Sequence, residues 1–394
     1  MNTSFDIVVI GVGSMGSAAC YYLSKRGYHV LGLEQFDISH EFGSHAGQSR
    51  IIRKAYFEHP DYVPLLEKAY RNWRSLERET GEQVYFKTGL LYAGDPDNVI
   101  IKGVEESAGL YNIDHDQLNT IAAADRFPAF KFPDNFEILF EPEAGFITPE
   151  KAIRIYAYEA KNNGATITTH EKVIEWKKDG NSVVVKTDKN SYQCDKLIIT
   201  TGAWAGKMIP GVADKIRVTR QFVAWIKTKN IRKDSREDEQ FELGKFPCWM
   251  IADDVKHGCY YGFPLLDTTK FGEPAGLKLA HHFPGNTTDP DNVNRQTTEE
   301  DLTNVKYCLD KYLPGVFDSF LSTKICLYSN SPDENFIIDK LPGFEGNVSI
   351  ACGFSGHGFK FAPVVGEILA DLATESETRL PIGFLSARRF AWRE

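Results

Sequence analysis

The stretch FDIVVIGVGSMGSAACYYLSKRGYHVLGLEQ, residues 5–35, decides the fold. Its pattern predicts a buried parallel strand, a tight turn, a helix and a second strand that ends at Leu33. The turn contains the spacing Gly11-x-Gly13-x-x-Gly16. In a dinucleotide-binding βαβ unit the first glycine permits the turn, the second lets backbone N–H groups approach a pyrophosphate, and the third allows close packing of helix on strand. The phosphates would lie at the positive end of the helix.

An acidic residue directly follows the second strand. Glu34 lies 18 residues after Gly16, close to the spacing of about 20 residues typical of the acid that binds ribose hydroxyls. Gln35 follows, and neither position has a neighbouring arginine or lysine. Glu34 would repel a 2′-phosphate, so the pattern favours FAD or NAD over NADP and leaves the choice between those two open.

Composition restricts the partners. The chain has 394 residues, 45 Lys and Arg against 54 Asp and Glu, and a net charge of −9. An acidic surface repels phosphate backbones and anionic lipid, so we expect a small-molecule partner, with no nucleic acid and no membrane. No apolar run approaches the ~20 residues that span a bilayer. The seven cysteines are scattered without a C-x-x-C pair, which favours reduced thiols, no metal site and a cytoplasmic location.

The middle of the chain favours one dinucleotide fold. Residues 63–78 and 151–162 have the apolar spacing of helices. Residues 166–202 predict strands, with a hairpin at Asp179-Gly180 and a last strand that leads to Gly202. Such a meander inserted into a nucleotide-binding unit is more typical of an FAD fold than of a simple NAD dehydrogenase, an argument from analogy between folds.

Seven ordered sequence blocks together are far more specific than any one of them. They are GVGSMG (11–16), GSHAGQSRIIRKAY (43–56), the strand before TTGAW (200–204), YYGFP (260–264), GLKL (276–279), ICLYSNSPDENFIID (325–339) and GFSGHGFKFAP (353–363). In this combination the chain resembles the flavin-dependent amine oxidases grouped as monomeric sarcosine oxidase and N-methyl-L-tryptophan oxidase.

The resemblance implies an α/β fold with two interleaved domains and a monomeric state. A Rossmann-like FAD-binding domain, of the glutathione-reductase and D-amino-acid-oxidase type, would comprise residues 1–85, 151–215 and 325–394. A substrate domain built on a mostly antiparallel sheet would comprise residues 86–150 and 216–324.

The activity implied by the resemblance is oxidation of a secondary-amine amino acid such as sarcosine or N-methyl-L-tryptophan. The product imine would hydrolyse and release formaldehyde, and O₂ would be reduced to H₂O₂. A cyclic amino acid such as pipecolate, or an electron acceptor other than oxygen, stays open as an alternative. The glycine motif alone would also suit an NAD-dependent dehydrogenase, and a protein that only stores FAD is a further alternative.

Cys326 is the expected point of covalent FAD attachment. From the residues alone it is a small apolar side chain in a short buried strand over 324–328. The resemblance implies a thioether between Cys326 and FAD. A nearby cation such as Lys324 would favour the thiolate if it faced the sulfur, and Cys352 is the nearest competing thiol.

The glycine-rich block GFSGHGFKFAP (353–363) precedes the last apolar helix and can be interpreted in two ways. It is either an ordinary strand-to-helix connection or a set of backbone donors that, with the helix dipole, stabilises negative charge on a reduced flavin. The resemblance implies the second reading. Lys360, in the same block, would then bind the substrate carboxylate.

Two arginines follow the second strand in a stretch read as a loop. From the residues alone Arg50 and Arg53 are a solvated pair, although a guanidinium suits a carboxylate. By resemblance Arg53 binds the substrate carboxylate, Arg50 lies beside the flavin ring and His45 helps to seat the cofactor. The family pattern GSHHGDTR is altered here, because Ala46, Gln48 and Ser49 replace a histidine, an aspartate and a threonine.

Lys278 is the expected oxygen-activating residue. On a strand it would face away from its leucine neighbours and would ordinarily be solvated. By resemblance it faces the flavin, where a fixed positive charge stabilises the anion formed as O₂ takes an electron. Tyr261, His282 and Tyr328 match positions that line the substrate pocket. His281 replaces the usual tyrosine, and residues 265–275 form a longer segment than usual.

The complete set of expected site residues follows. Lys278, Arg50, His282 and Tyr261 are expected to be catalytic, and Arg53, Lys360 and Tyr328 to bind substrate. FAD is expected to contact Gly11, Gly13, Ser14, Met15, Gly16, Glu34, Gln35, Ser44, His45, Arg50, Val173, Gly202, Trp204, Cys326, Gly356, His357, Gly358, Phe359 and Lys360.

Overall fold

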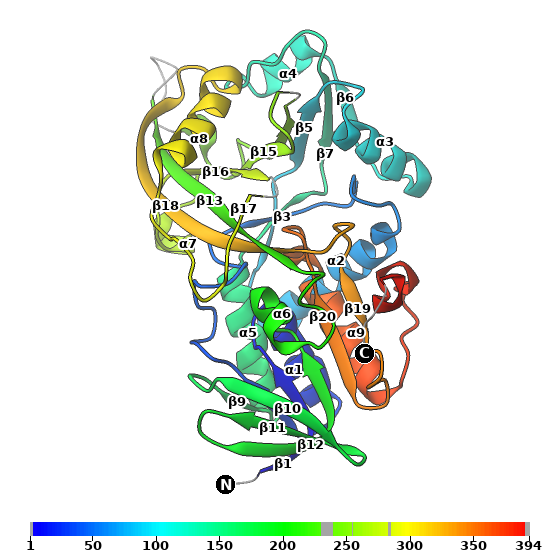
Figure 1. Ribbon diagram of the computed structural model, residues 1–394. Coiled ribbons are helices and arrows are strands. Elements are labelled where there is room, and N and C mark those ends of the chain that lie inside the picture. Colours follow the sequence, from blue (N-terminus) through cyan, green and yellow to red (C-terminus); the bar gives the residue numbers. More distant parts are fainter. Residues whose placement is uncertain (1–2, 230–238, 254, 283–284, 391–394) are drawn as a thin grey trace.

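The computed structural model describes residues 3–229, 239–253, 255–282 and 285–390. Two large β-sheets lie toward opposite ends of the molecule, and long strands and loops connect them (Figure 1). The parts of the predicted domains that fall on residues 1–2, 230–238, 254, 283–284 and 391–394 lie outside the described residues.

The first sheet is built around the strand of the glycine motif. Parallel strands run in the order β9-β2-β1-β12-β20, and β19 pairs antiparallel with β20. β10 and β11 form the predicted hairpin, which pairs with the first half of β12. The strands are β1 (Ser4–Ile10), β2 (Val30–Leu33), β9 (Thr166–Thr168), β10 (Val173–Asp179), β11 (Ser182–Thr187), β12 (Ser191–Ile199), β19 (Ile337–Lys340) and β20 (Val348–Cys352).

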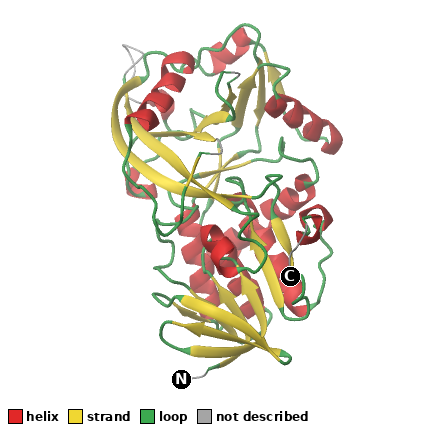
Figure 2. Ribbon diagram, in the orientation of Figure 1, coloured by secondary structure: helices red, strands yellow, loops and turns green. Residues whose placement is uncertain are grey.

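Four helices pack together beside this sheet (Figure 2). They are α1 (Ser14–Lys25), α2 (Tyr62–Thr80), α5 (Pro149–Asn162) and α9 (Ala362–Thr374). The apolar faces of α1 and α9 are rich in small side chains such as Ala18 and Ala370 and are buried. Burial of these faces stabilises the two segments as helices. The helices predicted over 63–78 and 151–162 are confirmed as α2 and α5. α2 ends at Gly81, whose φ of 73° is the left-handed conformation favoured at that position.

The second sheet is mostly antiparallel. Its order is β17-β13-β16-β15-β14-β5-β7-β6, with β18 paired to β13. Among the described strands of this sheet, only β14 and β5 pair in parallel. The strands are β5 (Leu90–Gly94), β6 (Asp116–Leu118), β7 (Glu137–Glu141), β13 (Arg217–Thr228), β14 (Cys248–Ala252), β15 (Cys259–Gly262), β16 (Leu277–His282), β17 (Asn286–Thr287) and β18 (Phe317–Asn330). This combination of a parallel and a mostly antiparallel sheet confirms the predicted fold class.

Smaller elements complete the fold. A third sheet joins β3 (Arg50–Ile52), β8 (Gly145–Ile147) and β4 (Tyr85–Lys87). The remaining helices are α3 (Val99–Tyr111), α4 (Thr120–Arg126), α6 (Ala205–Met208), α7 (Thr268–Phe271) and α8 (Glu299–Tyr312). None of the helices in the described part of the chain is long and apolar enough to cross a membrane.

The two-domain division stays a prediction. The first sheet takes its strands from residues 4–33, 166–199 and 337–352, and the second from 90–141 and 217–330. β18 is unbroken from Phe317 to Asn330, so the boundary predicted between residues 324 and 325 lies inside a strand.

The glycine motif has the geometry that its spacing predicts. Gly11 has a φ of +87°, a conformation that L side chains rarely adopt. A Cβ at Gly16 would lie 1.9 Å from the Gly11 carbonyl oxygen, so helix α1 packs against β1 as closely as only glycine allows. A Cβ at Gly13 would meet nothing within 4 Å.

Gly16→Ala therefore tests the close packing of α1. The added methyl has no room beside the Gly11 carbonyl, and we expect a loss of about 1–3 kcal/mol in the free energy of unfolding. Gly109→Ala is a matched control, because Gly109 lies in helix α3 and its Cβ would meet nothing within 4 Å. That variant should be stabilised by up to about 1 kcal/mol. Chemical denaturation measures both changes, and equal effects would contradict the packing argument.

Candidate functional site

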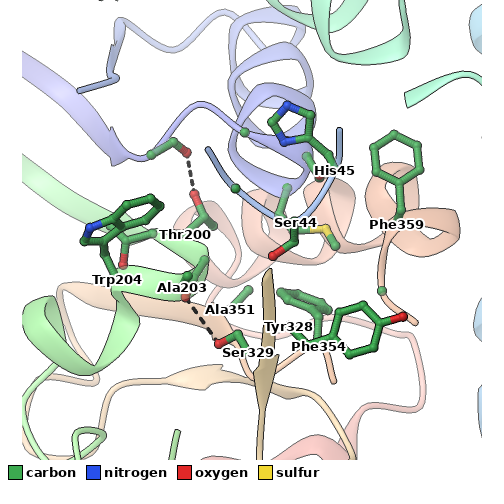
Figure 3. Close-up of a pocket in the computed structure, with 18 of the residues that line it drawn as sticks. Ser44, His45, Thr200, Ala203, Trp204, Tyr328, Ser329, Ala351, Phe354 and Phe359 are labelled. Carbon is green, nitrogen blue, oxygen red and sulfur yellow. Dashed lines mark hydrogen bonds between the residues drawn. The ribbon is translucent and has the colours of Figure 1, made fainter. Parts of the chain in front are cut away.

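A cavity of about 600 Å³ extends from the glycine turn of the first sheet to strands of the second. Figure 3 shows side chains from both regions around it, among them Thr200, Trp204 and Tyr328. Most of the predicted site residues line it: Gly11, Gly13, Ser14, Met15, Glu34, Gln35, Ser44, His45, Arg50, Arg53, Val173, Gly202, Trp204, Tyr261, His282, Cys326, Tyr328, Gly356, His357, Gly358, Phe359 and Lys360. Gly16 and Lys278 are not in its wall, because Gly16 packs against Gly11 and Lys278 lies behind a turn.

The glycine-turn end of the cavity has the features of a nucleotide site. The Glu34 carboxylate faces the cavity and accepts hydrogen bonds from the backbone N–H groups of Val12 (2.9 Å) and Phe36 (3.1 Å). Burial raises the pKa of Glu34 to about 7 despite these donors. Ribose hydroxyls would donate to this carboxylate and stabilise its charge.

Two buried polar atoms at the cavity have no hydrogen-bond partner among the residues that the structure describes. They are Nε2 of His45 and Oγ1 of Thr201. A buried polar group without a partner costs about 1–3 kcal/mol, so both atoms are suited to bind a polar ligand. With the open space at Gly13 and the carboxylate of Glu34, these atoms fit a dinucleotide such as FAD.

Lys278 is held behind the cavity wall by oxygen atoms. The reading of a solvated lysine is wrong, because only 1% of Lys278 is exposed. Its Nζ donates to the carbonyl oxygens of Gly47 and Ser49 (2.6 Å for Ser49) and lies 3.1 Å from Ser49 Oγ. Burial, and secondarily the charge of Arg50, lower the pKa of Lys278 well below its usual value. The carbonyl dipoles oppose this shift and stabilise the ammonium form.

The turn that holds Lys278 is itself fixed by Glu150 and by Gln48, one of the positions that differ from the family pattern. Glu150 accepts hydrogen bonds from the backbone N–H groups of Gly47 (2.6 Å) and Gln48 (3.1 Å). The Gln48 amide donates to the carbonyls of Gly272 (2.6 Å) and Pro274 (3.0 Å), and its oxygen accepts from Trp225. Gln48 thus attaches the longer 265–275 segment to the turn. These two departures from the family pattern, Gln48 and the longer segment, therefore have a common structural explanation.

The expected cation, Lys324, does not face the Cys326 sulfur. Lys324 forms an ion pair with Glu41 instead. Burial raises the pKa of the Cys326 thiol, and the charges of Arg50, Lys278 and Arg295 act against that shift. These are the cations that would favour a thiolate here. Cys352 is buried in β20 and does not line the cavity.

The opposite end of the cavity contains a buried ion pair. Both Glu58 carboxylate oxygens accept from Arg53 Nη2, at 2.6 and 2.7 Å, and Arg53 is only 2% exposed. Burial alone would raise the pKa of Glu58, but the positive charge of Arg53 overcomes it and lowers the pKa to about 2. Arg50 and Arg53, which the sequence alone suggested to be a solvated pair in a loop, also differ in secondary structure. Arg50 begins strand β3, whereas Arg53 follows it.

Lys360 lies near this pair and forms no ion pair with any carboxylate in the described ranges. Its Nζ donates to the His357 carbonyl (2.7 Å) and lies 3.4 Å from the Tyr56 hydroxyl oxygen. Burial, and then the charge of Arg53, lower the pKa of Lys360 to about 7. The cavity therefore presents cationic groups that an anionic ligand would stabilise.

The histidines at this end are neutral. His357 Nε2 donates to the Glu334 carbonyl (3.0 Å), so Nδ1 accepts from the Tyr56 hydroxyl (2.6 Å). Burial lowers the pKa of His357 to about 3 and that of His282 to about 4. His282 Nδ1 lies 3.0 Å from the Tyr328 hydroxyl oxygen.

The sequence did not predict several of the residues that line or support the cavity. Glu58, Thr201 and Met250 line the cavity, and Glu150 supports the Lys278 turn from outside it. Only Glu58 had a usable signal, an acid five residues after Arg53. His281 lies on β16 beside His282 and stacks on Tyr260, with ring centroids 4.4 Å apart. Nowhere in the described ranges do three or more His, Cys, Asp or Glu side chains form a group that could hold a metal ion.

The comparisons with known proteins agree with this geometry. Residues 6–372 match the model of the family described as FAD dependent oxidoreductase. The chain is 37% identical to monomeric sarcosine oxidase of Bacillus sp. (strain NS-129), covering 99% of this chain and 98% of that one. It is 34% identical to N-methyl-L-tryptophan oxidase of Salmonella dublin, over 94% of both chains.

Solved structures support the fold. The open form of a Tyr258Phe mutant of NikD, an unusual amino acid oxidase, superimposes with a TM-score of 0.83 at 23% identity, covering 98% of this chain and 97% of that one. L-proline dehydrogenase from P. horikoshii gives a TM-score of 0.80 at 24% identity, covering 99% of this chain and 98% of that one.

The pH dependence of anion binding tests the charge of Lys360. Its ammonium is present below a pKa of about 7 and is lost as the pH rises through that value. We expect the Kd for propionate, a carboxylate without an amine, to rise above pH 7 by up to about tenfold per pH unit. Lys360→Met should remove this dependence, and substitution of the exposed Lys131 should not. A Kd that stays constant between about pH 6 and 9 in the unmodified protein would contradict the assignment.

Proposed function

Because the chain belongs to the FAD-dependent oxidoreductase family, and within it to the group of monomeric sarcosine oxidase and N-methyl-L-tryptophan oxidase, we propose that it oxidises a secondary-amine amino acid and reduces oxygen. The resemblance read from the sequence is confirmed, and the choice between FAD and NAD is resolved in favour of FAD. The observation that carries the proposal is a cavity with a nucleotide site at one end and buried cations at the other.

FAD would lie along this cavity. Glu34 and the glycine turn would hold its ribose and pyrophosphate, and the unpartnered His45 Nε2 and Thr201 Oγ1 would bind its polar groups. Bound FAD supplies the two-electron redox chemistry that no amino-acid side chain provides. The protein contributes binding, orientation and charge.

The cationic end would bind the substrate carboxylate. Arg53 offers a planar two-donor group and Lys360 a second positive charge. Glu58 now occupies the Arg53 guanidinium, so a carboxylate would have to share or replace that ion pair. Fixing the carboxylate orients the amine and the adjacent C–H bond, which makes the reaction effectively unimolecular. The neutral histidines and the cations favour a neutral amine, whose lone pair is needed for oxidation.

Lys278 would serve the oxygen step. Its positive charge, stabilised by the Gly47 and Ser49 carbonyls, lowers the energy of an anion that forms nearby. Arg50, which lines the cavity, adds to this positive potential. O₂ would be reduced to H₂O₂, and the imine product would hydrolyse in water, with release of formaldehyde from an N-methyl substrate.

The substrate and acceptor define the alternatives that remain. A cyclic amino acid such as pipecolate also places a carboxylate beside a secondary amine, so it would satisfy the same cations. A dehydrogenase would pass the electrons to an acceptor other than oxygen, and a storage protein would hold FAD without turnover. The position of Lys278 beside the wall favours oxygen as acceptor.

A screen for peroxide release distinguishes these functions. Purified holoenzyme is mixed with sarcosine, N-methyl-L-tryptophan and pipecolate, and peroxide is measured against substrate consumed. We expect one peroxide for each amine oxidised, with formaldehyde only from the N-methyl substrates. Substrate loss without peroxide would indicate another acceptor, and no reaction with any secondary amine would contradict the proposed function.

Cys326 is proposed to attach FAD through a thioether. Its support is its place in the cavity wall and the surrounding charges of Arg50, Lys278 and Arg295. We expect acid-precipitated protein to remain yellow, and the same treatment of Cys326→Ser to release FAD into solution. Cys352→Ser is the matched control and should keep its FAD. Release of FAD from the unmodified protein, or from Cys352→Ser alone, would contradict attachment at Cys326.

A monomer in the cytoplasm is also proposed. The monomer rests on the resemblance alone. The location is supported by the seven cysteines, all free and buried, which suit a reducing compartment.

A further inference from the structure

A buried acid outside the cavity wall contacts the loop that carries Arg53. Glu141 ends strand β7 and is fully buried (0% exposed). Its carboxylate accepts hydrogen bonds from the backbone N–H groups of Lys54 (2.7 Å) and Ala55 (3.2 Å). None of the roles derived above uses this residue. A buried carboxylate is costly unless it is hydrogen bonded, so its place beside this loop requires an explanation.

A backbone carbonyl of this same loop binds the Arg53 guanidinium. Arg53 Nη1 donates to the carbonyl oxygen of Ala55 at 2.7 Å. The Tyr92 hydroxyl lies 2.9 Å from Glu141 Oε2 and 3.2 Å from that carbonyl oxygen. The loop is therefore held at the Lys54 and Ala55 N–H groups by Glu141 and at the Ala55 carbonyl by Arg53. Glu141, Arg53, Tyr92 and Ala55 are buried, and Lys54 is partly buried.

The anchoring residues belong to the second sheet. Tyr92 lies on β5 and Glu141 on the neighbouring β7, where Glu141 pairs with Leu90. Tyr92 also pairs with Met250 of β14, which lines the cavity. The loop after β3 is thus bonded to two paired strands of the second sheet, which limits the positions that the guanidinium can adopt.

We propose that Glu141 is a positioning residue for the carboxylate site, because its contacts with the Lys54 and Ala55 N–H groups fix the carbonyl that holds the Arg53 guanidinium. This inference rests on the proposed function, in which Arg53 binds the substrate carboxylate. Removing the carboxylate takes the acceptor from the partly buried Lys54 N–H and the buried Ala55 N–H, and frees the loop to move. The guanidinium then loses its fixed direction, and ligands that depend on it bind less tightly.

Binding of a carboxylate and of its amide separates positioning from general stability. Propionate and propionamide are titrated into holoenzyme, and the change in its visible spectrum gives each Kd. In Glu141→Gln we expect the Kd for propionate to rise about tenfold, the size expected for loss of one buried hydrogen bond, and that for propionamide to stay within about twofold. KM for the amino-acid substrate should rise by a similar factor, with less change in kcat.

Two further variants keep the test decisive. Tyr92→Phe removes one hydroxyl from the same network, should weaken propionate binding by a smaller factor, and decides the question if Glu141→Gln does not fold. Glu143→Gln changes an acid two residues away that pairs with Lys87 and Arg74 on the surface, and should change neither Kd.

The outcomes distinguish this inference from the proposed function. An equal loss of affinity for both ligands, or no change in either variant, would overturn the positioning role while the unmodified protein still prefers propionate. An unmodified protein that does not prefer propionate to propionamide would overturn the carboxylate site itself, and this inference with it.

Discussion

Three buried cations are the main energetic constraint on this structure. Arg53, Lys278 and Lys360 are 2%, 1% and 5% exposed, and removing such a charge from water costs several kcal/mol unless partners replace the solvent. Within the described part of the chain only Arg53 has a bonded carboxylate, Glu58, whereas both lysines are bonded to neutral oxygen atoms, mainly backbone carbonyls. Such partners stabilise the ammonium forms without cancelling their charge, whereas burial lowers the pKa of both lysines.

Backbone carbonyls can hold a cation only if the peptides that carry them are fixed. At Lys278 the peptides belong to the Gly47–Ser49 turn, which Glu150 holds at its N–H groups. At Arg53 the carbonyl is that of Ala55, and Glu141 accepts from the N–H groups of Lys54 and Ala55 just before it. Two of the three cations, Lys278 and Arg53, thus lie on one side of a turn that a carboxylate holds from the other side. This arrangement fixes these two cations beside the cavity, where an anionic ligand would bind.

The sequence was sufficient for the parts determined by local geometry. The glycine spacing predicted the βαβ unit, Glu34 and the nucleotide end, because backbone sterics and helix packing dictate those residues. The meander and the helices followed from hydrophobic periodicity in the same way. The resemblance supplied most other cavity residues, although their roles remain predictions. The burial of Lys278 was indicated only by the resemblance, since its neighbours along the chain suggested a solvated side chain.

What sequence reading missed depends on contacts between distant segments. Glu141 and Glu150 bind loops about a hundred residues earlier in the chain, and no local pattern marks an acid that will accept backbone N–H groups. Lys324 was chosen as the partner of Cys326 because it is two residues away, but it reaches Glu41 instead. Gln48 and the 265–275 segment were recognised as separate departures, and only the fold shows that they bond to each other.

The most direct test of the central claim is an anaerobic titration of the purified protein with sarcosine or another secondary-amine amino acid, followed in the visible absorption spectrum. If the cavity holds FAD beside bound substrate, the protein is yellow as purified, the absorption is lost as substrate is added, and it returns when oxygen is admitted. A protein that has no visible absorption and does not bind added FAD, or one whose bound FAD is unchanged by every secondary amine, would contradict this account.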